Sequence, residues 1–354
     1  MANDVTDGYD RRRVLKAVGI AGAFGLAGCV GEEPEGGDNE SGGDQEPEEG
    51  GQNVVWDAGG TGGTYYPLSG EFKTIVEENT PHVLQVRSTG ASVENVGNLE
   101  NEEADFALIQ NDVGYFAFNG TGLDEFEGNP VETLRGVATL YPETIHIITR
   151  PDAGIESLED LEGTTVNTGD LGSGTQVNAL QILDSVGLSQ DDFEEQNTGF
   201  SQAGDQLQDG DIDAAFIVGG WPVGAVEELA TTAEIDILNI EQEDRQTILE
   251  GAEWFAEDTI PAGTYDGIEE DVDTVSVQAM IATHEAVDDA LVEDVTAAIF
   301  DNTDSISTKA DFISADTALD GMSFEMHPAA AAYFDEQGSG NESSGNESEN
   351  ETEQ

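Results

Sequence analysis

In the middle of the chain, short apolar runs alternate with segments whose apolar residues recur at helical spacing. Residues 54–56 read as a buried strand, and the glycine-rich segment 59–64 follows as a loop. Leu68, Phe72 and Ile75 then recur at the spacing of one helix face. This order predicts a strand, a tight loop and a helix.

The same order returns further along the chain. A strand at 165–167 leads into the glycine-rich segment 169–175, and Val177, Leu180 and Leu183 mark the inner face of the next helix. The repetition indicates two similarly wound α/β units.

Two aspartates extend the likeness between the units. Asp105 follows a helix and precedes the apolar run 106–109, and Asp213 precedes the apolar run 214–217 in the same way. We expect both side chains to hold the turn before a strand rather than to touch a ligand.

The remaining strands predict how the two units connect. The chain leaves the first through 136–140 and 145–149 and returns through 274–281, and two such crossings make a hinge. We therefore expect an α/β protein of two lobes: lobe 1 at 53–143 and 262–337, lobe 2 at 144–261.

The N-terminus carries the features of an export signal. Arg11, Arg12 and Arg13 precede an apolar run at 14–28, which ends in the string LAGC at Cys29. The pattern resembles a Tat signal with a lipoprotein cleavage site, and the run is shorter than the roughly 20 residues of a membrane span. We expect residues 1–28 to be removed and Cys29 to carry lipid at the extracytoplasmic face of the membrane.

Both ends of the mature chain are polar and acidic. Residues 29–52 form a predicted disordered tether, and residues 338–354 form a predicted disordered tail with three N-x-S/T patterns. Whether those patterns are glycosylated stays open.

Acidic residues outnumber basic residues by 76 to 10, and the net charge is -66 at pH 7. Such a chain repels nucleic acid, so we expect no partner of that kind. The charges largely stop repelling one another at about 1 M salt, where the Debye length is about 3 Å. The composition therefore indicates an extremely halophilic cell.

Five strings, in order, carry a family likeness. They are GTGGTYYP at 60–67, STGASVEN at 88–95, QNDV at 110–113, GSGT at 172–175 and IPAGTY at 260–265. They resemble the TAXI-type solute receptors of tripartite ATP-independent (TRAP) transporters. Ala91 departs from the family pattern, which more often has glycine, and Trp221 replaces a smaller residue.

The resemblance implies a periplasmic-binding-protein-like fold of type II that closes over a small carboxylated solute, such as glutamate or a related dicarboxylate. A TRAP membrane permease would be its partner. Glycine-rich loops that open helices suit a carboxylate independently of the resemblance, because free backbone N–H groups point outward there. The candidate ligand-binding residues are Thr61, Gly62, Gly63, Thr64, Tyr65, Arg87, Ser88, Thr89, Ser92, Gln110, Asn111, Ser173, Gly174, Thr175 and Trp221.

Other function classes lack their motifs. The sequence has no G-x-S-x-G elbow, no P-loop and no complete dinucleotide fingerprint, so we expect no catalytic residue, cofactor or metal. A secreted lipid-anchored hydrolase and a cell-surface structural module stay open as alternatives.

The predicted anchor is testable. Cys29→Ser should release folded protein into the medium or leave it unprocessed, because the lipid attachment atom is lost. Fractionation of cells that express the variant measures this. Unchanged membrane retention would contradict the lipoprotein assignment.

Overall fold

One ten-stranded sheet runs through the part of the chain that the computed structural model describes, residues 46–123 and 125–344. The strands are β1 (Asn53–Asp57), β2 (Val83–Arg87), β3 (Phe106–Gln110), β4 (Leu134–Thr149), β5 (Thr165–Asn167), β6 (Glu194–Gln196), β7 (Ala214–Gly219), β8 (Asp236–Ile237), β9 (Ala256–Ile260) and β10 (Val272–His284). The helices are α1 (Tyr65–Asn79), α2 (Ser92–Glu100), α3 (Asn111–Asn119), α4 (Gly174–Ser185), α5 (Phe200–Asp209), α6 (Gly224–Thr232), α7 (Gln242–Gly251), α8 (Asp289–Asp301) and α9 (Pro328–Ser344).

The strand order repeats the same arrangement twice. It reads β2-β1-β3-β10-β4-β7-β5-β6. In one half β2, β1 and β3 are parallel and β10 joins β3 antiparallel; in the other β6, β5 and β7 are parallel and β4 joins β7 antiparallel. The α/β fold with two lobes is confirmed. We call the group around β1–β3 with α1–α3, α8 and α9 lobe 1, and the group around β5–β7 with α4–α7 lobe 2.

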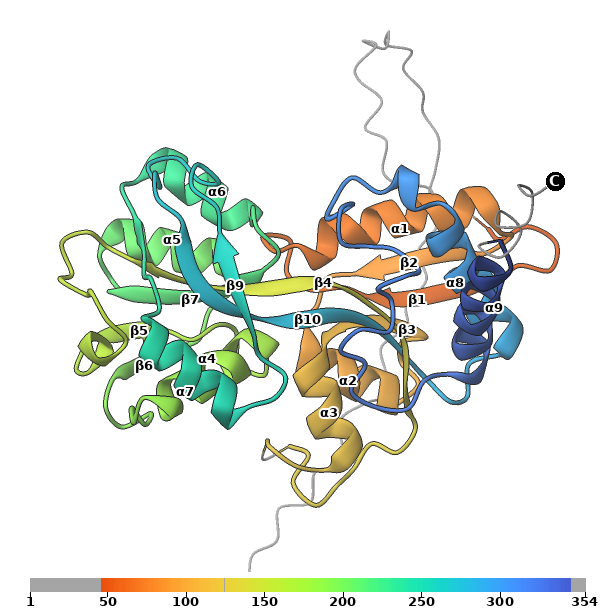
Figure 1. Ribbon diagram of the computed structural model, residues 1–354, viewed down its shortest axis with the longest axis horizontal. Coiled ribbons are helices and arrows are strands. Elements are labelled where there is room, and N and C mark those ends of the chain that lie inside the picture. The colour runs from red at the N-terminus through yellow and green to blue at the C-terminus, as the bar shows by residue number, and fades with distance from the viewer. Residues whose placement is uncertain (1–45, 124, 345–354) are drawn as a thin grey trace, which may run out of the picture. The chain divides into compact units, whose positions relative to one another are not determined.

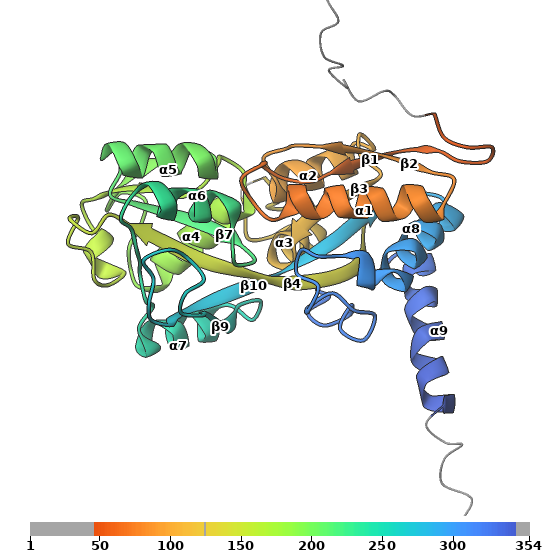
Figure 2. The same cartoon turned by 90° about the horizontal axis from the view of Figure 1, so that it is seen from above.

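The strands β4 and β10 pass between the lobes side by side (Figure 1; Figure 2). At the crossing, Glu143 pairs with Val277 and Thr144 with Ser276. The prediction of two separate strands at 136–140 and 145–149 was wrong, because β4 is continuous across both. Pro142 has no N–H to donate, yet the strand continues; next to it β4 carries one extra residue between Pro142 and Thr139, opposite Gln278 and Met280 of β10.

The return to lobe 1 occurs later than predicted. Tyr265, Ile268 and Val272 pack in one cluster with Ile217 of β7, so they belong with lobe 2. The chain re-enters lobe 1 along β10, after Ser276, rather than at residue 262.

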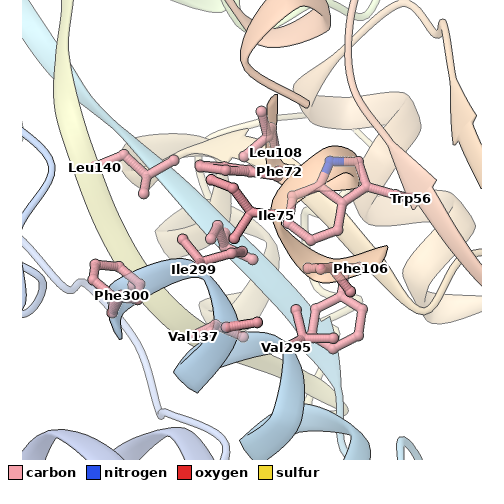
Figure 3. Close-up of a cluster of buried hydrophobic side chains, with 14 of the residues drawn as sticks. Trp56, Phe72, Ile75, Phe106, Leu108, Val137, Leu140, Val295, Ile299 and Phe300 are labelled. Carbon is pink, nitrogen blue, oxygen red and sulfur yellow. The ribbon is translucent and has the colours of Figure 1, made fainter. Parts of the chain in front are cut away.

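Lobe 1 is held together by an aromatic core. Trp56 of β1 stacks on Phe106 of β3 at 5.6 Å between ring centroids and meets Phe72 of α1 edge-on at 5.7 Å (Figure 3). The indole Nε1 donates to Ser69 Oγ at 3.0 Å, and Ser69 Oγ donates to the Tyr65 carbonyl at 2.7 Å. These contacts fix the first turn of α1 on β1.

Asp105 and Asp213 play the same part in the two lobes. Asp105 Oδ2 accepts from the backbone N of Val55 at 2.7 Å, and Asp213 Oδ2 accepts from the backbone N of Thr165 at 3.0 Å. Each therefore satisfies an N–H at the edge of the first strand of its lobe. Their predicted structural role is confirmed.

Within the described residues, the ordered part of the chain extends into both segments that were predicted to be disordered. Glu48 N donates to the Pro81 carbonyl and Gln52 N donates to His82 Nδ1, so the end of the predicted tether packs on lobe 1. The helix α9 runs to Ser344, through the start of the predicted tail. Cys29 and the signal lie outside the described residues. Within residues 46–123 and 125–344, no helix is long and apolar enough to cross a membrane.

The two aspartates give a stability test. Asp105→Ala leaves the Val55 N–H without its partner and should lower the free energy of unfolding by about 1–3 kcal/mol. Asp105→Asn keeps an acceptor oxygen and should cost less. Urea unfolding in high salt measures both, and equal losses in the two variants would show that the hydrogen bond is not the cause.

Candidate ligand-binding site

A cavity of about 510 Å³ lies between the lobes. Lobe 1 contributes Gly59, Gly60, Thr61, Gly62, Gly63, Thr64, Tyr65, Ser88, Thr89, Gly90, Ala91, Ser92 and Gln110. Lobe 2 contributes Asp170, Ser173, Gly174, Thr175, Gly199, Phe200, Ser201, Gln202 and Val218, and Glu143 comes from the crossing strand β4. A volume of this size suits a small organic solute.

Four helices begin at the cavity wall. Tyr65 opens α1, Ser92 opens α2, Gly174 opens α4 and Phe200 opens α5, and all four residues line the cavity. The first amides of a helix have no carbonyl partner within the helix, and the helix dipole places partial positive charge there. The cavity is therefore bordered by four helix N-termini, and none of its described lining residues is a lysine or arginine.

The lobes touch each other beside the cavity. The Gly62 carbonyl accepts from Ala225 N at 3.0 Å, and Thr64 Oγ1 donates to the Gly220 carbonyl at 3.3 Å. On the other side, Asn178 Nδ2 of α4 donates to the buried carboxylate of Asp112 in α3 at 2.8 Å. The two lobes are thus in direct contact on two sides of the cavity.

Two glycines allow this close approach. A Cβ added at Gly174 of lobe 2 would lie 2.0 Å from Gln110 Oε1 and 2.8 Å from Ser92 Oγ, both in lobe 1. A Cβ at Gly62 would lie 2.8 Å from Ser201 Oγ of lobe 2. Neither glycine has positive φ, so its absent side chain matters here for space, not for backbone conformation.

Most of the residues selected from the sequence line the cavity. They are Thr61, Gly62, Gly63, Thr64, Tyr65, Ser88, Thr89, Ser92, Gln110, Ser173, Gly174 and Thr175. Some of their polar atoms already form hydrogen bonds within the protein. Ser173 Oγ caps α4 by accepting from Gln176 N at 3.1 Å, and Ser88 Oγ donates to the Gly59 carbonyl at 3.0 Å.

Three selected residues do not line the cavity. The Arg87 guanidinium is bound to the fully buried carboxylate of Asp57 through contacts of 2.6 and 2.8 Å, which raise the pKa of Arg87. Asn111 accepts from Gln278 N and donates to the Gly321 carbonyl, so it ties α3 to β10. The Trp221 ring lies under the ammonium of Lys309 at 5.0 Å. Because Arg87 is bound to Asp57 and lies outside the cavity lining, its role as a cation for the ligand stays a prediction.

Ala91 has an unusual backbone conformation at the cavity wall. Its φ is +69° at the start of α2, a region that favours glycine. The departure from glycine noted in the sequence therefore falls at a position where glycine would carry less strain.

Two acidic residues of the wall were missed. Asp170 and Glu143 both line the cavity, and Glu143 is only 3% exposed. Burial raises the pKa of Glu143 to about 8, against a usual 4.5. Burial also raises the pKa of nearby Asp112 to about 7. The sequence offered no signal for Glu143, because it stands alone within a strand.

The family model of the NMT1-like family matches residues 57–338. The chain belongs to the NMT1-like family. Solved structures similar to this NMT1-like chain include a protein of Bordetella bronchiseptica RB50, with 17% identity, 82% of each chain covered and a TM-score of 0.49. Another is the alkanesulfonate-binding protein SsuA from Xanthomonas axonopodis pv. citri, with 13% identity, 74% of this chain and 78% of that chain covered, and a TM-score of 0.44. A third is a TctC solute-binding protein from Polaromonas, with 15% identity, 81% and 94% covered, and a TM-score of 0.42.

The raised pKa of Glu143 makes the stability of this NMT1-like protein depend on pH. As pH rises above about 4.5 the unfolded chain loses this proton while the folded chain keeps it until about pH 8, so folded-state stability falls across that window. Glu143→Gln should remove that part of the loss, which is on the order of a few kcal/mol between pH 4.5 and 8.5.

The measurement is urea unfolding at several pH values in high salt. The control is Glu100→Gln, an exposed acid whose charge water already solvates, and it should follow the wild-type profile. Parallel profiles for wild type and Glu143→Gln would contradict the assignment of a buried, proton-bearing Glu143.

Proposed function

We propose that this NMT1-like protein is the extracytoplasmic solute receptor of a TRAP-type, ion-gradient-driven transporter. It captures a small carboxylated solute, such as glutamate or a related dicarboxylate, by closure of its lobes. The observation that carries the proposal is the convergence of four helix N-termini, two from each lobe, on one cavity.

A carboxylate fits this wall better than a neutral solute does. Tyr65, Ser92, Gly174 and Phe200 are the first residues of their helices, so their backbone amides have no partner within the helix. The hydroxyls of Thr61 and other wall residues add further hydrogen-bond donors. Backbone donors bind an anion without requiring a lysine or arginine, which suits a chain that has only 10 basic residues. Because the donors come from both lobes, a bound carboxylate stabilises the closed arrangement.

The assignment to the TAXI type of receptor rests on the sequence strings. The TAXI-like segments at 60–67, 88–95 and 172–175 supply the cavity-lining loops, which supports a TAXI receptor with a TRAP permease as partner. The lipid on Cys29 and export by Tat would place the receptor at the outer face of the membrane. Residues 53–143 with 262–337 and residues 144–261 approximate the two moving bodies, with the correction at β10 given above.

The substrate class is tested by a thermal-shift screen of the protein without residues 1–28 in high salt. L-glutamate, 2-oxoglutarate and succinate are the first probes, with neutral sugars for comparison. A solute at 100 times its Kd should stabilise the fold by about 2.7 kcal/mol. Stabilisation by sugars alone would contradict the proposal, and turnover of a screened ester would favour a hydrolase.

Closure is tested by Gly174→Ala. The added methyl group clashes with Gln110 and Ser92 only when the lobes close, so solute affinity should fall at least tenfold while the unfolding midpoint of the ligand-free protein barely moves. Calorimetry and circular dichroism measure the two effects. The control is Gly70→Ala on the exposed side of α1, where an added Cβ meets nothing within 4 Å and affinity should be retained. Wild-type affinity in Gly174→Ala would contradict closure.

A further inference from the structure

Glu143 occupies a distinctive place in the cavity. It lies on β4 where the two crossing strands pair, opposite Val277, and so belongs to neither lobe alone. Its side chain lines the cavity and is 3% exposed, and its Oε1 atom is buried without a hydrogen-bond partner in the structure. An unpaired buried polar atom in a cavity wall indicates a group that its ligand completes.

The charged and titratable groups that face Glu143 come from four elements. They are Tyr141 on β4, Tyr65 on α1, Asp112 on α3 and Lys309 in the segment before α9. The Oη atoms of both tyrosines and Oδ1 of Asp112 are also buried without a hydrogen-bond partner among the described residues, although the proximity of Tyr141 and Lys309 opposes part of the rise in the pKa of Glu143. Most of this surrounding is therefore acidic or neutral.

Lys309 does not neutralise Glu143 by direct contact. Its ammonium lies over the Trp221 ring at 5.0 Å from the centroid, and among the described residues no ion pair within 4.0 Å joins it to Glu143. A buried carboxyl without an ion pair keeps its proton to higher pH than an exposed one, which agrees with the raised pKa of Glu143.

A protonated Glu143 adds a hydrogen-bond donor to the cavity wall. An ionised Glu143 would repel a solute carboxylate across a cavity that holds no lysine or arginine, whereas a neutral Glu143 has an O–H to donate. We propose that the receptor binds its anionic solute together with one proton, which comes from solvent, resides on Glu143 and is donated in a hydrogen bond to a solute carboxylate. This inference rests on the proposed function and specifies how that site recognises charge.

Recognition of a solute ammonium by ionised Glu143 would have the opposite pH dependence. An ammonium needs the deprotonated acid, so affinity would rise as pH increases toward 8 and protons would be released on binding. A carboxylate needs the protonated acid, so affinity should fall above pH 8 and protons should be taken up. The sign of the proton exchange separates the two.

The experiment is calorimetry of the protein without residues 1–28 in high salt, with succinate and 2-oxoglutarate as probes because their carboxyl groups do not titrate between pH 6.5 and 9.5. L-glutamate between pH 6.5 and 8 is the probe that also carries an ammonium, so it tests the rival mode of recognition. For wild type, we expect Kd to be constant up to about pH 7.5 and to rise about tenfold per pH unit above 8. Titrations in two buffers with different ionisation enthalpies should show uptake of nearly one proton at pH 9. Proton release, or a Kd independent of pH, would overturn the inference.

Two variants assign the proton to its residue. Glu143→Gln cannot titrate, so its Kd for the same probe should stay constant within a factor of two from pH 6.5 to 9.5, with no proton uptake. Asp112→Asn removes the other buried acid with a raised pKa and should keep the rise in Kd above pH 8. Loss of the rise in Asp112→Asn but not in Glu143→Gln would overturn the assignment to Glu143.

A ligand-free measurement keeps the proposed function and this inference distinguishable. Carbon-13 NMR of the glutamate carboxyl groups should show one signal, absent in Glu143→Gln, that titrates near pH 8. A midpoint below pH 6 would overturn the inference even if carboxylates bind. Failure of every carboxylate probe at pH 6.5, where the acid is protonated, would instead overturn the proposed function and the inference with it.

Discussion

The pairing of β4 with β10 is the constraint on which the site depends. These two strands carry the chain between the lobes, and they pair with each other from Leu134 to Thr144 while each also joins the sheet of both lobes. The loops that open α1, α2, α4 and α5 are thereby aimed at one cavity, and Glu143 stands at the pairing itself. In the proposed closure, a small rotation about these strands would change the separation of the loops without disturbing either core.

Under the proposed function, helix N-termini would reconcile the chain's net charge of -66 with an anionic solute. The mean charge opposes binding at long range, but high salt confines that repulsion to a few ångströms. Within the cavity the helix N-termini count most, because the first residues of four helices line the same space and helix dipoles place partial positive charge there. In our proposal, a proton on Glu143 removes a negative charge from the wall, and among the described lining residues Asp170 of lobe 2 is the other acid.

The parts of the fold that repeat in the sequence were predictable, and isolated residues were not. Glycine-rich loops followed by helical spacing identified β1 with α1 and β5 with α4, and Asp105 and Asp213 were placed by their equivalent positions. The ion pair of Arg87 was not predictable, because its partner Asp57 is 30 residues away and becomes adjacent only when β1 pairs with β2. Glu143 has no local pattern, and its role depends on burial at a crossing of strands that are distant in the sequence.

Distance measurement between spin labels on the two lobes tests the account most directly. Removal of residues 1–28 together with Cys29 leaves no cysteine, so Glu100→Cys in lobe 1 and Leu171→Cys at the 77% exposed rim of lobe 2 can be labelled selectively. Without solute, double electron–electron resonance should give a distribution of label-to-label distances that is broader, or centred at a longer distance, than with solute. With a saturating carboxylate it should narrow to the single short distance of the closed structure, and a distribution that does not change on binding would contradict closure around the solute.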